Sequence, residues 1–403
     1  MKKIIVLCYL LITIIVSGQE LTSSDQQMVE EKQVWAFYLS FWTGEASWVA
    51  NEGIITDYPL IGRYNSKMPD VAAQHIAQAK SAGINAFIVS WFGIQELVTT
   101  TPAFISLLDR AAEMDFQVAV GVDAYNPAFN REFDGMRQSL QWLMDEAISH
   151  PGYLHYQGKP IIVFAFQDET GWNDQTWLEL RDTVDPWRET YWIAEGLSAC
   201  CLYDGAMDGM YAFNMAWASG EEDYYIAERN LVNSRGGIYI PSISPGWDEA
   251  TIAVLENRPR PTSSRERDNG SFLLKAWQAA INTESRIVMI VSWNEFMENS
   301  HIEPSEQYGT QSLDTLRPLI EEWLGKTVLP VADQVYSYVA QVKPQTPAFE
   351  NPSTESALLA ILEPGRNYPV IAEDYGWYQI RLDDSTLAFV HFSQIDLLPV
   401  WDD

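Results

Sequence analysis

Short apolar runs of strand length alternate with amphipathic stretches of helical length from Gln33 to about Trp323. The runs are continuously apolar, which is typical of parallel strands buried on both faces. Eight such runs with intervening helices predict an α/β fold, a (β/α)8 TIM-type barrel, with a doubly wound open sheet as the alternative. The predicted strands are Val34–Leu39, Ala86–Trp91, Val118–Val122, Ile161–Phe166, Thr190–Ala194, Gly209–Phe213, Gly237–Pro241 and Ile287–Trp293.

The stretches between these runs carry helix signals. Pro69 and Asp70 open the first in the way that helices commonly begin, and Gly83 ends it. The link between the fifth and sixth strands is short, and we expect no full helix there. The predicted helices are Asp70–Ala82, Ala103–Met114, Phe133–Ser149, Gly220–Asn233 and Gly270–Asn282.

The pattern changes after the predicted barrel domain, residues 33–328. Residues 329–350 contain Pro344 and Pro347 and are predicted to be a linker. Beyond them, short strands separated by turn residues predict a small all-β domain over residues 351–400. Its predicted strands are Ala357–Leu362, Tyr368–Glu373, Gly376–Arg381 and Thr386–His391.

Residues 1–18 have the composition of an export signal. Lys2 and Lys3 precede the apolar run Ile4–Val16, and two small residues follow it. The run is too short to span a bilayer comfortably, so we expect no membrane insertion. The alternative is a buried N-terminal helix. We therefore expect an exported protein in the periplasm, on the cell surface or outside the cell.

The charge and the metal-binding residue types exclude several classes of protein. The net charge is −30 with only 25 basic residues, which argues against nucleic acid and anionic membranes as partners. The five histidines form no ligand pattern, so we expect neither a metal nor another cofactor. The neighbouring Cys200 and Cys201 do not suggest a disulfide framework.

Candidate catalytic groups follow the eighth predicted strand, since active sites of such barrels lie at the carboxyl ends of the strands. Glu295 and Glu298 are three residues apart, and both fall on one side if the chain turns helically there. Neighbouring carboxyl groups push each other's pKa apart, which gives the acid and the base that glycoside cleavage needs. A chance E-x-x-E spacing is the alternative.

Aromatic and polar residues at the same ends are candidates for binding a sugar, because sugar rings stack on flat aromatic faces. For Asp123, a helix N-cap or a structural carboxylate is the alternative, and for Trp91, Tyr125 and Trp247 it is a place in the core. The candidates are Tyr38, Trp42, Trp91, Asp123, Tyr125, Trp247, Asn294 and His301.

Several motifs occur in order between Trp35 and Trp323. They are RYNS at 63–66, AKSAGIN at 79–85, VSWFG at 89–93, HPGY at 150–153, SPGWD at 244–248 and SWNEFMENSHIEP at 292–304. Together they resemble glycoside hydrolase family 99, the endo-α-mannosidase and endo-α-mannanase group, with its relatives in bacterial polysaccharide loci. The resemblance adds Tyr64 to the candidate substrate-binding residues and places Asp123 where the family usually has glutamate.

This resemblance implies an endo-acting glycoside hydrolase for α-linked, mannose-containing or related glycans, which retains the anomeric configuration through a 1,2-anhydro sugar. By position, Glu295 would be the base on the 2-hydroxyl, and Glu298 would act first as acid and then as base. Phe296, Met297 and Asn299 depart from the Trp, His and Gly of the family pattern. The alternative is a catalytically weak glycan-binding or polysaccharide-assembly protein on the same barrel.

The C-terminal region carries Asn351-Pro352-Ser353-Thr354, Gly365 and Gly376-Trp377-Tyr378 in an order that resembles a bacterial SH3-like domain. The resemblance implies a small SH3-like barrel and contact with cell-wall material or a glycan. A purely structural appendage is the alternative.

Overall fold

A computed structural model describes residues 32–96, 99–126, 129, 132–196, 199–215, 220–255, 264–328, 337–374, 376–382 and 386–400. The predicted export signal, residues 1–18, lies outside the described residues, as do residues 329–336 of the predicted linker.

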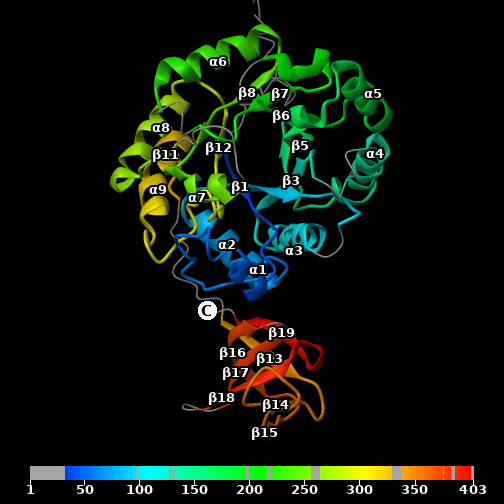
Figure 1. Cartoon of the computed structure of the whole chain (residues 1–403), viewed down its shortest axis with the longest axis vertical. Coiled ribbons are helices and arrows are strands. Elements are labelled where there is room, and N and C mark those ends of the chain that lie inside the picture. Colours follow the sequence, from blue (N-terminus) through cyan, green and yellow to red (C-terminus); the bar gives the residue numbers. More distant parts are fainter. Residues whose placement is uncertain are drawn as a thin grey trace, which may run out of the picture. The chain divides into compact units, whose positions relative to one another are not determined.

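A mostly parallel sheet forms the centre of the larger part of the chain, with helices around it (Figure 1). Its parallel strands are β1 (Gln33–Tyr38), β2 (Ala86–Trp91), β3 (Gln117–Asp123), β5 (Lys159–Ala165), β6 (Tyr191–Glu195), β7 (Gly209–Tyr211), β8 (Ile238–Ile240), β9 (Ser242–Ile243) and β12 (Ile287–Ile290). They lie in the order β8-β7-β6-β5-β3-β2-β1-β12-β9. The short β4 (His155–Tyr156) pairs antiparallel with β5.

The two ends of this order are nearly joined. Only Pro241 separates β8 from β9, and proline lacks the N–H that would continue the ladder. The carbonyl of Pro241 nevertheless accepts a hydrogen bond from the N–H of Met289 at 2.9 Å. The segment therefore pairs with β7 through its first half and with β12 through its second half, which brings the sheet close to a ring and is consistent with a TIM-type barrel.

Helices surround the strands in Figure 1. They are α1 (Glu45–Ala50), α2 (Pro69–Ser81), α3 (Thr100–Glu113), α4 (Phe133–Trp142), α5 (Asp174–Val184), α6 (Glu222–Ser234), α7 (Ala250–Leu255), α8 (Ser271–Ile281) and α9 (Gln311–Leu324). In the part of the chain that the structure describes, none of the helices is both long and apolar enough to cross a membrane.

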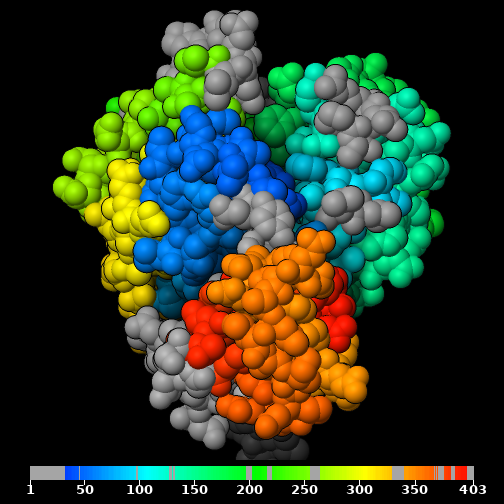
Figure 2. All heavy atoms as spheres, turned by 60° about the horizontal axis from the view of Figure 1, so that its bottom comes forward, coloured from blue at the N-terminus to red at the C-terminus, as the bar shows by residue number. Residues whose placement is uncertain are grey.

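Helices α2 and α9 contact each other, and the blue and yellow surfaces adjoin in Figure 2. Arg317 of α9 donates a hydrogen bond to the carbonyl of Ser81 at 2.5 Å. Gly83 follows α2 with a φ of 86°, and a Cβ there would lie 2.6 Å from the side chain of Ile320. Glycine is therefore required at this position both for its backbone conformation and for the close approach of α9.

The elements agree closely with those expected from the sequence. Each predicted barrel strand has a counterpart, although β7 and β12 end earlier than expected. The predicted helix Phe133–Ser149 consists of α4 followed by a π-helical turn at Leu143–Ala147. Between β6 and β7 lies a 3₁₀ segment, Ala199–Gly205, in place of an α-helix, as expected for a short link. The sequence analysis did not single out α1, α5, α7 and α9.

The C-terminal part is a separate antiparallel sheet with its own buried residues, which include Ala340, Ile380 and Val390. The four predicted strands are present, but the sheet also contains β13 and β14, which lie within the predicted linker 329–350. Pro347 is the first residue of β14, a position that tolerates a missing N–H. The likeness to an SH3-like domain stays a prediction. The strands are β13 (Ser337–Val342), β14 (Pro347–Phe349), β15 (Leu358–Ile361), β16 (Asn367–Asp374), β17 (Trp377–Arg381), β18 (Leu387–His391) and β19 (Ile395–Val400).

The position of β13 predicts where the chain can be shortened. A chain that ends at Pro330 should keep the oligomeric state of the full-length protein, with a barrel melting temperature within about 3 °C of the full-length value, because it keeps the barrel core intact. A chain that ends at Lys343 keeps β13 without β16 and β19, and so exposes Ala340 and Val342. It should aggregate more readily. Calorimetry and size-exclusion chromatography of both chains test this, and the reverse order of behaviour would contradict it.

Candidate active site

The chain after β12 forms a loop, residues 291–303, whose two arms are hydrogen-bonded to each other. The N–H of Ser292 donates to the carbonyl of Ser300 at 3.0 Å, and the N–H of Ile302 donates to the carbonyl of Ser292 at 3.0 Å. The hydroxyls of Ser292 and Ser300 are 3.1 Å apart. These hydrogen bonds close the loop where its two arms meet, and so they hold residues 295–298 at the carboxyl end of β12.

Glu295 is fixed at both its backbone and its side chain. Its N–H donates to the hydroxyl of Ser292 at 2.8 Å, and its Oε1 accepts a hydrogen bond from the N–H of Met297 at 2.9 Å. Only 5% of the residue is exposed. The backbone donor fixes the position of one carboxylate oxygen, and a general base must be held in a fixed position.

Glu298 lies in a turn, residues 296–299, that is not part of an α-helix. Its carbonyl accepts a hydrogen bond from the N–H of Asp248 at 2.8 Å, which links the loop to β10 (Trp247–Asp248), and one of its carboxylate oxygens is buried. Asn299 ends the turn with a φ of 54°, in the left-handed region that glycine and asparagine tolerate best. Asparagine can therefore stand where the family pattern has glycine.

Asn294 ties this loop to the end of β1. The N–H of Leu39 donates to Asn294 Oδ1 at 2.6 Å, and Asn294 Nδ2 donates to the carbonyl of Leu39 at 2.9 Å. The same Nδ2 donates to the hydroxyl of Tyr64 at 2.9 Å. Because Asn294 is fully buried, these bonds make it a brace of the loop.

Tyr64 and Tyr38 belong to a buried network around Glu303. The hydroxyl of Tyr64 donates to Glu303 Oε2 at 2.9 Å, and His75 Nε2 lies 3.1 Å from Glu303 Oε1. The hydroxyl of Tyr38 lies 3.0 Å from His75 Nδ1. Burial and the charge of Glu303 raise the pKa of both tyrosines, so both stay protonated at neutral pH. Tyr38 and Tyr64, two of the substrate-binding candidates, are thus buried and linked to His75 of α2 and to Glu303 of the loop.

His301 is a second brace of the loop. Its ring stacks on Phe296 at 4.1 Å, and its Nε2 lies 3.0 Å from Asp57 Oδ2 and 3.3 Å from Arg267 Nη2. Burial, followed by the charge of Arg267, lowers the pKa of His301 to about 4. The ring is therefore neutral at neutral pH, and the short contact is best described as Nε2–H donating to Asp57. Although burial raises the pKa of Asp57, hydrogen bonds from His301 and Ser305 bring it to about 2.

The tryptophan candidates are buried. Trp42 stacks on Trp48 at 3.8 Å, and its Nε1 donates to the carbonyl of Asn294 at 3.3 Å. Trp91 Nε1 donates to the hydroxyl of Thr101 at 3.0 Å. Trp247 meets Phe213 edge to face at 6.1 Å and is also almost fully buried. None of these three rings offers an open face in this structure.

Asp123 and Tyr125 are more accessible. Asp123 is the last residue of β3, and the N–H groups of Tyr125 and Asn126 donate to its carboxylate. Burial nevertheless raises the pKa of Asp123 to about 6. Both Asp123 and Tyr125 are half-buried, so the structure leaves them open to a ligand at the ends of the strands.

A further carboxylate, which the sequence analysis missed, lies across the barrel end. Glu195 is the last residue of β6 and pairs in register with Tyr211 of β7. Burial, then the backbone N–H of Phe166 and the charges of Asp168 and Asp123, together bring the pKa of Glu195 to about 7. The predicted strand Thr190–Ala194 stopped one residue short of it, so one more strand-end position would have revealed it.

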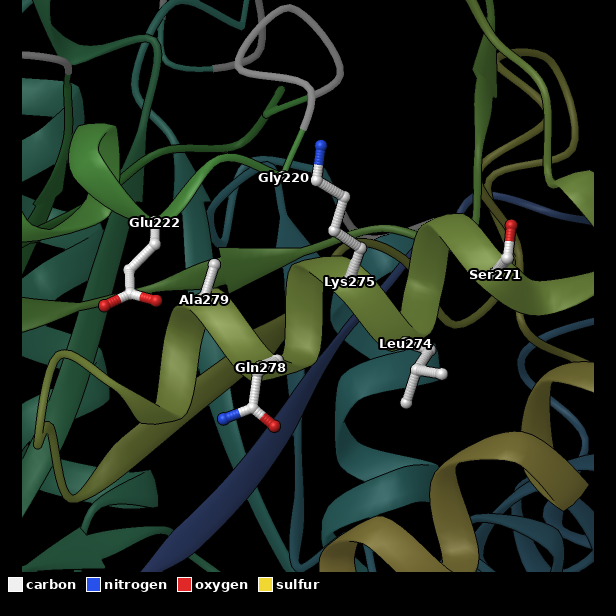
Figure 3. Close-up of a pocket in the computed structure, with 7 residues that line it drawn as sticks. All are labelled: Gly220, Glu222, Ser271, Leu274, Lys275, Gln278 and Ala279. Atoms are coloured by element: carbon white, nitrogen blue, oxygen red, sulfur yellow. The ribbon is translucent and has the colours of Figure 1, made fainter.

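A surface recess on the outer helices lies apart from these groups (Figure 3). It is lined by Gly220, Glu222, Ser271, Leu274, Lys275, Gln278 and Ala279, and none of them is a candidate site residue. Within the described residues, no group of three or more histidine, cysteine or acidic side chains could hold a metal ion.

Comparisons with known proteins agree with the motif resemblance. Residues 43–319 match the sequence model of glycosyl hydrolase family 99. The glycoprotein endo-α-1,2-mannosidase-like protein of Homo sapiens is 27% identical over 267 residues, which cover 61% of this chain and 56% of that protein. The glycoprotein endo-α-1,2-mannosidase of Rattus norvegicus is 26% identical over 281 residues, 64% of this chain and 59% of the relative. The chain thus spans less than two thirds of the length of these relatives.

A solved structure, the family 99 endo-α-mannosidase from Bacteroides thetaiotaomicron, has the same fold. It superposes with a TM-score of 0.63 at 21% sequence identity and covers 73% of this chain and 98% of that chain. At this identity the superposition supports the architecture of the barrel and not its specificity.

The raised pKa of Glu195 predicts a pH-dependent effect on stability. Above pH 7 the folded protein bears the full cost of burying the ionised carboxylate, whereas at pH 5 the folded-state carboxyl is protonated and most of that cost is absent. Glu195→Gln should therefore raise the free energy of unfolding by on the order of 3 kcal/mol at pH 8 and by less than about 1 kcal/mol at pH 5. Denaturant unfolding at both pH values measures this. Glu222→Gln, in the outer recess, is the control, and an equal gain at both pH values would contradict the prediction.

Proposed function

Because this chain belongs to glycosyl hydrolase family 99, we propose that it is an endo-acting, retaining glycosidase for α-linked glycans that contain mannose or a related sugar. The observation that carries the proposal is the braced loop after β12, which holds Glu295 and Glu298 three residues apart at the carboxyl end of a barrel strand. A pair of carboxyl groups at that end supplies the acid and the base of glycoside cleavage.

In the proposed first step, Glu295 takes the proton from the 2-hydroxyl of the sugar. The 2-oxygen attacks its own anomeric carbon, and the bond from that carbon to the leaving oxygen breaks. Glu298 gives its proton to the leaving oxygen. The products of this step are a 1,2-anhydro sugar and a free hydroxyl on the departing glycan.

In the second step, water attacks the anomeric carbon from the face that the leaving group occupied. Glu298, now ionised, takes the proton of the water. The bond between the anomeric carbon and the 2-oxygen breaks, and Glu295 returns its proton to that oxygen. Two inversions at the anomeric carbon give net retention, and both carboxyl groups regain their starting protonation states.

The surroundings of each glutamate support this assignment. Glu295 accepts a backbone hydrogen bond from Met297 and is held at its own N–H by Ser292, which suits a base with a fixed direction. Glu298 is more exposed than Glu295 and follows a turn anchored to Asp248, which suits a group that meets both the leaving oxygen and water. The named relatives are endo-α-1,2-mannosidases, and at 26–27% identity the sugar and linkage belong to the proposal.

The experiment that tests the proposal is hydrolysis of α-linked mannose oligosaccharides followed by proton NMR. The α-anomer of the new reducing end should appear first and should then mutarotate. Internal linkages should be cut before terminal ones, as expected for an endo-acting enzyme. Initial release of the β-anomer would exclude the anhydro-sugar route, and no release from any α-linked glycan would favour a glycan-binding protein.

The two roles predict different effects of the two Glu→Gln variants. Glu298→Gln cannot protonate the leaving oxygen, so a substrate with a sugar leaving group should lose roughly 10²–10⁴-fold in kcat. A glycosyl fluoride needs little protonation, so formation of the anhydro sugar from it should slow much less. Glu295→Gln should slow both substrates alike, because attack by the 2-oxygen is impaired with either leaving group.

Steady-state rates of both variants on the two substrate types measure this difference. Glu222→Gln is the matched control, because the same change in the outer recess leaves the loop untouched. Near-native rates for both variants on a confirmed substrate would place the chemistry elsewhere at the barrel end.

A further inference from the structure

Asp123, Ala165, Glu195 and Tyr211 form one row across four neighbouring strands. Asp123 pairs with Ala165, and Glu195 pairs with Tyr211. Ala165 follows Phe164, the partner of Ala194, and therefore lies beside Glu195. Side chains of residues that pair in register point to the same face of a sheet. The four side chains consequently share one face at the carboxyl ends of their strands.

This face is the inside of the barrel. Gly121 lies two residues before Asp123 and so shares its face, and a Cβ on Gly121 would meet the ring of Phe37 at 2.8 Å. Phe37 in turn stacks with Tyr211 at 6.3 Å, so both rings lie on that side of the sheet. The strands of Asp123 and Glu195 are two spacings, about 10 Å, apart. Ala165, which lies on the strand between them, contributes only a methyl group to this face.

Two polar atoms of the row have no hydrogen-bond partner among the described residues. Tyr211 is fully buried, and its hydroxyl has no hydrogen-bond partner among the residues that the structure describes. The same holds for Asp123 Oδ1. Tyr211 pairs in register with Glu195, and after burial the charges of Glu195 and Asp123 raise the pKa of its hydroxyl. Buried polar atoms without partners are costly, so these atoms point to a ligand that binds there.

The charge of the row indicates what kind of ligand that is. The strongest charge effects on Glu195 come from Asp168, Asp123 and Glu169, and all three are carboxylates that raise its pKa. A neutral hydroxyl group would leave this repulsion in place. A bound cation would neutralise it, and an ammonium group has three N–H donors for the three acceptor groups of the row.

The backbone of Phe166 lies beside the row, and its side chain is the exposed aromatic group nearest to it in the sequence. Its N–H donates to Glu195 Oε2 at 3.0 Å, and 46% of the residue is exposed. Its φ of 54° is unusual for a bulky side chain, and such conformations gather at binding and catalytic sites. Sugars bind proteins through stacking on exposed aromatic rings together with hydrogen bonds to carboxylates, and Phe166 can supply the first of these to a ligand of the row.

We propose that Asp123, Glu195 and Tyr211 form a subsite for the protonated amino group of an amino sugar in the glycan, with Phe166 as the stacking surface. This inference rests on the proposed function, since it names a sugar within the substrate of the same barrel end. The amino group lies at position 3, 4 or 6 if the subsite holds the sugar that is cleaved, because the proposed mechanism uses the 2-hydroxyl. N-acetylation removes the positive charge, so the subsite discriminates against acetylated sugars.

Binding of small probes tests the subsite without any need for turnover. The probes are methyl α-mannoside, its 3-, 4- and 6-amino-deoxy analogues and the N-acetyl form of each, titrated into the full-length protein by calorimetry or NMR. At least one amine should bind about 10- to 100-fold more tightly than its N-acetyl form and than methyl α-mannoside, the range expected for charge-assisted hydrogen bonds. Equal affinities, or no amine binding at millimolar concentration, would overturn the proposal.

Three variants locate the effect. Glu195→Gln keeps the shape but removes one charge, and should reduce the preference for the amine about tenfold or more. Ala165→Leu keeps both carboxylates but puts a larger side chain on the strand between them, and should abolish the preference. Glu222→Gln in the outer recess should leave it unchanged. A preference that survives Glu195→Gln would refute the assignment.

The outcomes separate this inference from the proposed function. Retaining hydrolysis of neutral α-linked glycans without any preference for an amine would leave the proposed function standing and remove the amino-sugar subsite. A preference that depends on Glu195, in a protein that hydrolyses no α-linked glycan, would support the subsite and remove the proposed function.

Discussion

The side-chain amide of Asn294 joins the loop that carries both candidate catalytic carboxylates to the first strand of the barrel. It exchanges hydrogen bonds with both backbone groups of Leu39, as a neighbouring strand would, and it also donates to Tyr64. Tyr64 then bonds to Glu303, which belongs to the far arm of the same loop. The loop is therefore held from both arms by buried polar groups, and Glu295 and Glu298 owe their placement to those groups and not to a helix.

The two acidic regions at this end of the barrel lie in opposite environments. Around Glu295, the N–H of Met297 donates to the carboxylate and the hydroxyl of Ser292 accepts from the N–H of Glu295, so both the side chain and the backbone are held before any ligand arrives. Burial raises the pKa of both Asp123 and Glu195, and nearby carboxylates, Asp123 among them, raise the pKa of Glu195 further. The first arrangement suits a group that takes up and returns a proton in place. The second costs stability in the free protein, a cost that ligand binding recovers, as is common where function and stability compete.

The sequence predicted the strands well because parallel barrel strands are apolar on both faces, and this leaves a continuous signal. For the same reason it did not show which side chains face inward. Phe37 lies inside the barrel, while its neighbour Tyr38 faces α2. A continuously apolar run does not distinguish an inward-facing residue from an outward-facing one. The bond between Tyr64 and Glu303 joins residues 239 positions apart, and no local pattern encodes it. The predicted linker contains two strands because its prolines interrupt neither of them: Pro344 follows β13, and Pro347 begins β14.

The departures from the family pattern fall on positions with different physical roles. Phe296 stacks on His301 and packs against Trp42 and Trp48, so another aromatic ring at this position preserves the core behind the loop. Asn299 tolerates the left-handed backbone conformation, and its carbonyl accepts a hydrogen bond from Arg267 at 3.1 Å. Both changes leave the brace of the loop intact. Met297 differs, because it is half-buried between the two glutamates and replaces an ionisable imidazole with an apolar thioether. A change in substrate specificity within this loop is therefore expected to arise at Met297, while its neighbours keep the two carboxylates in place.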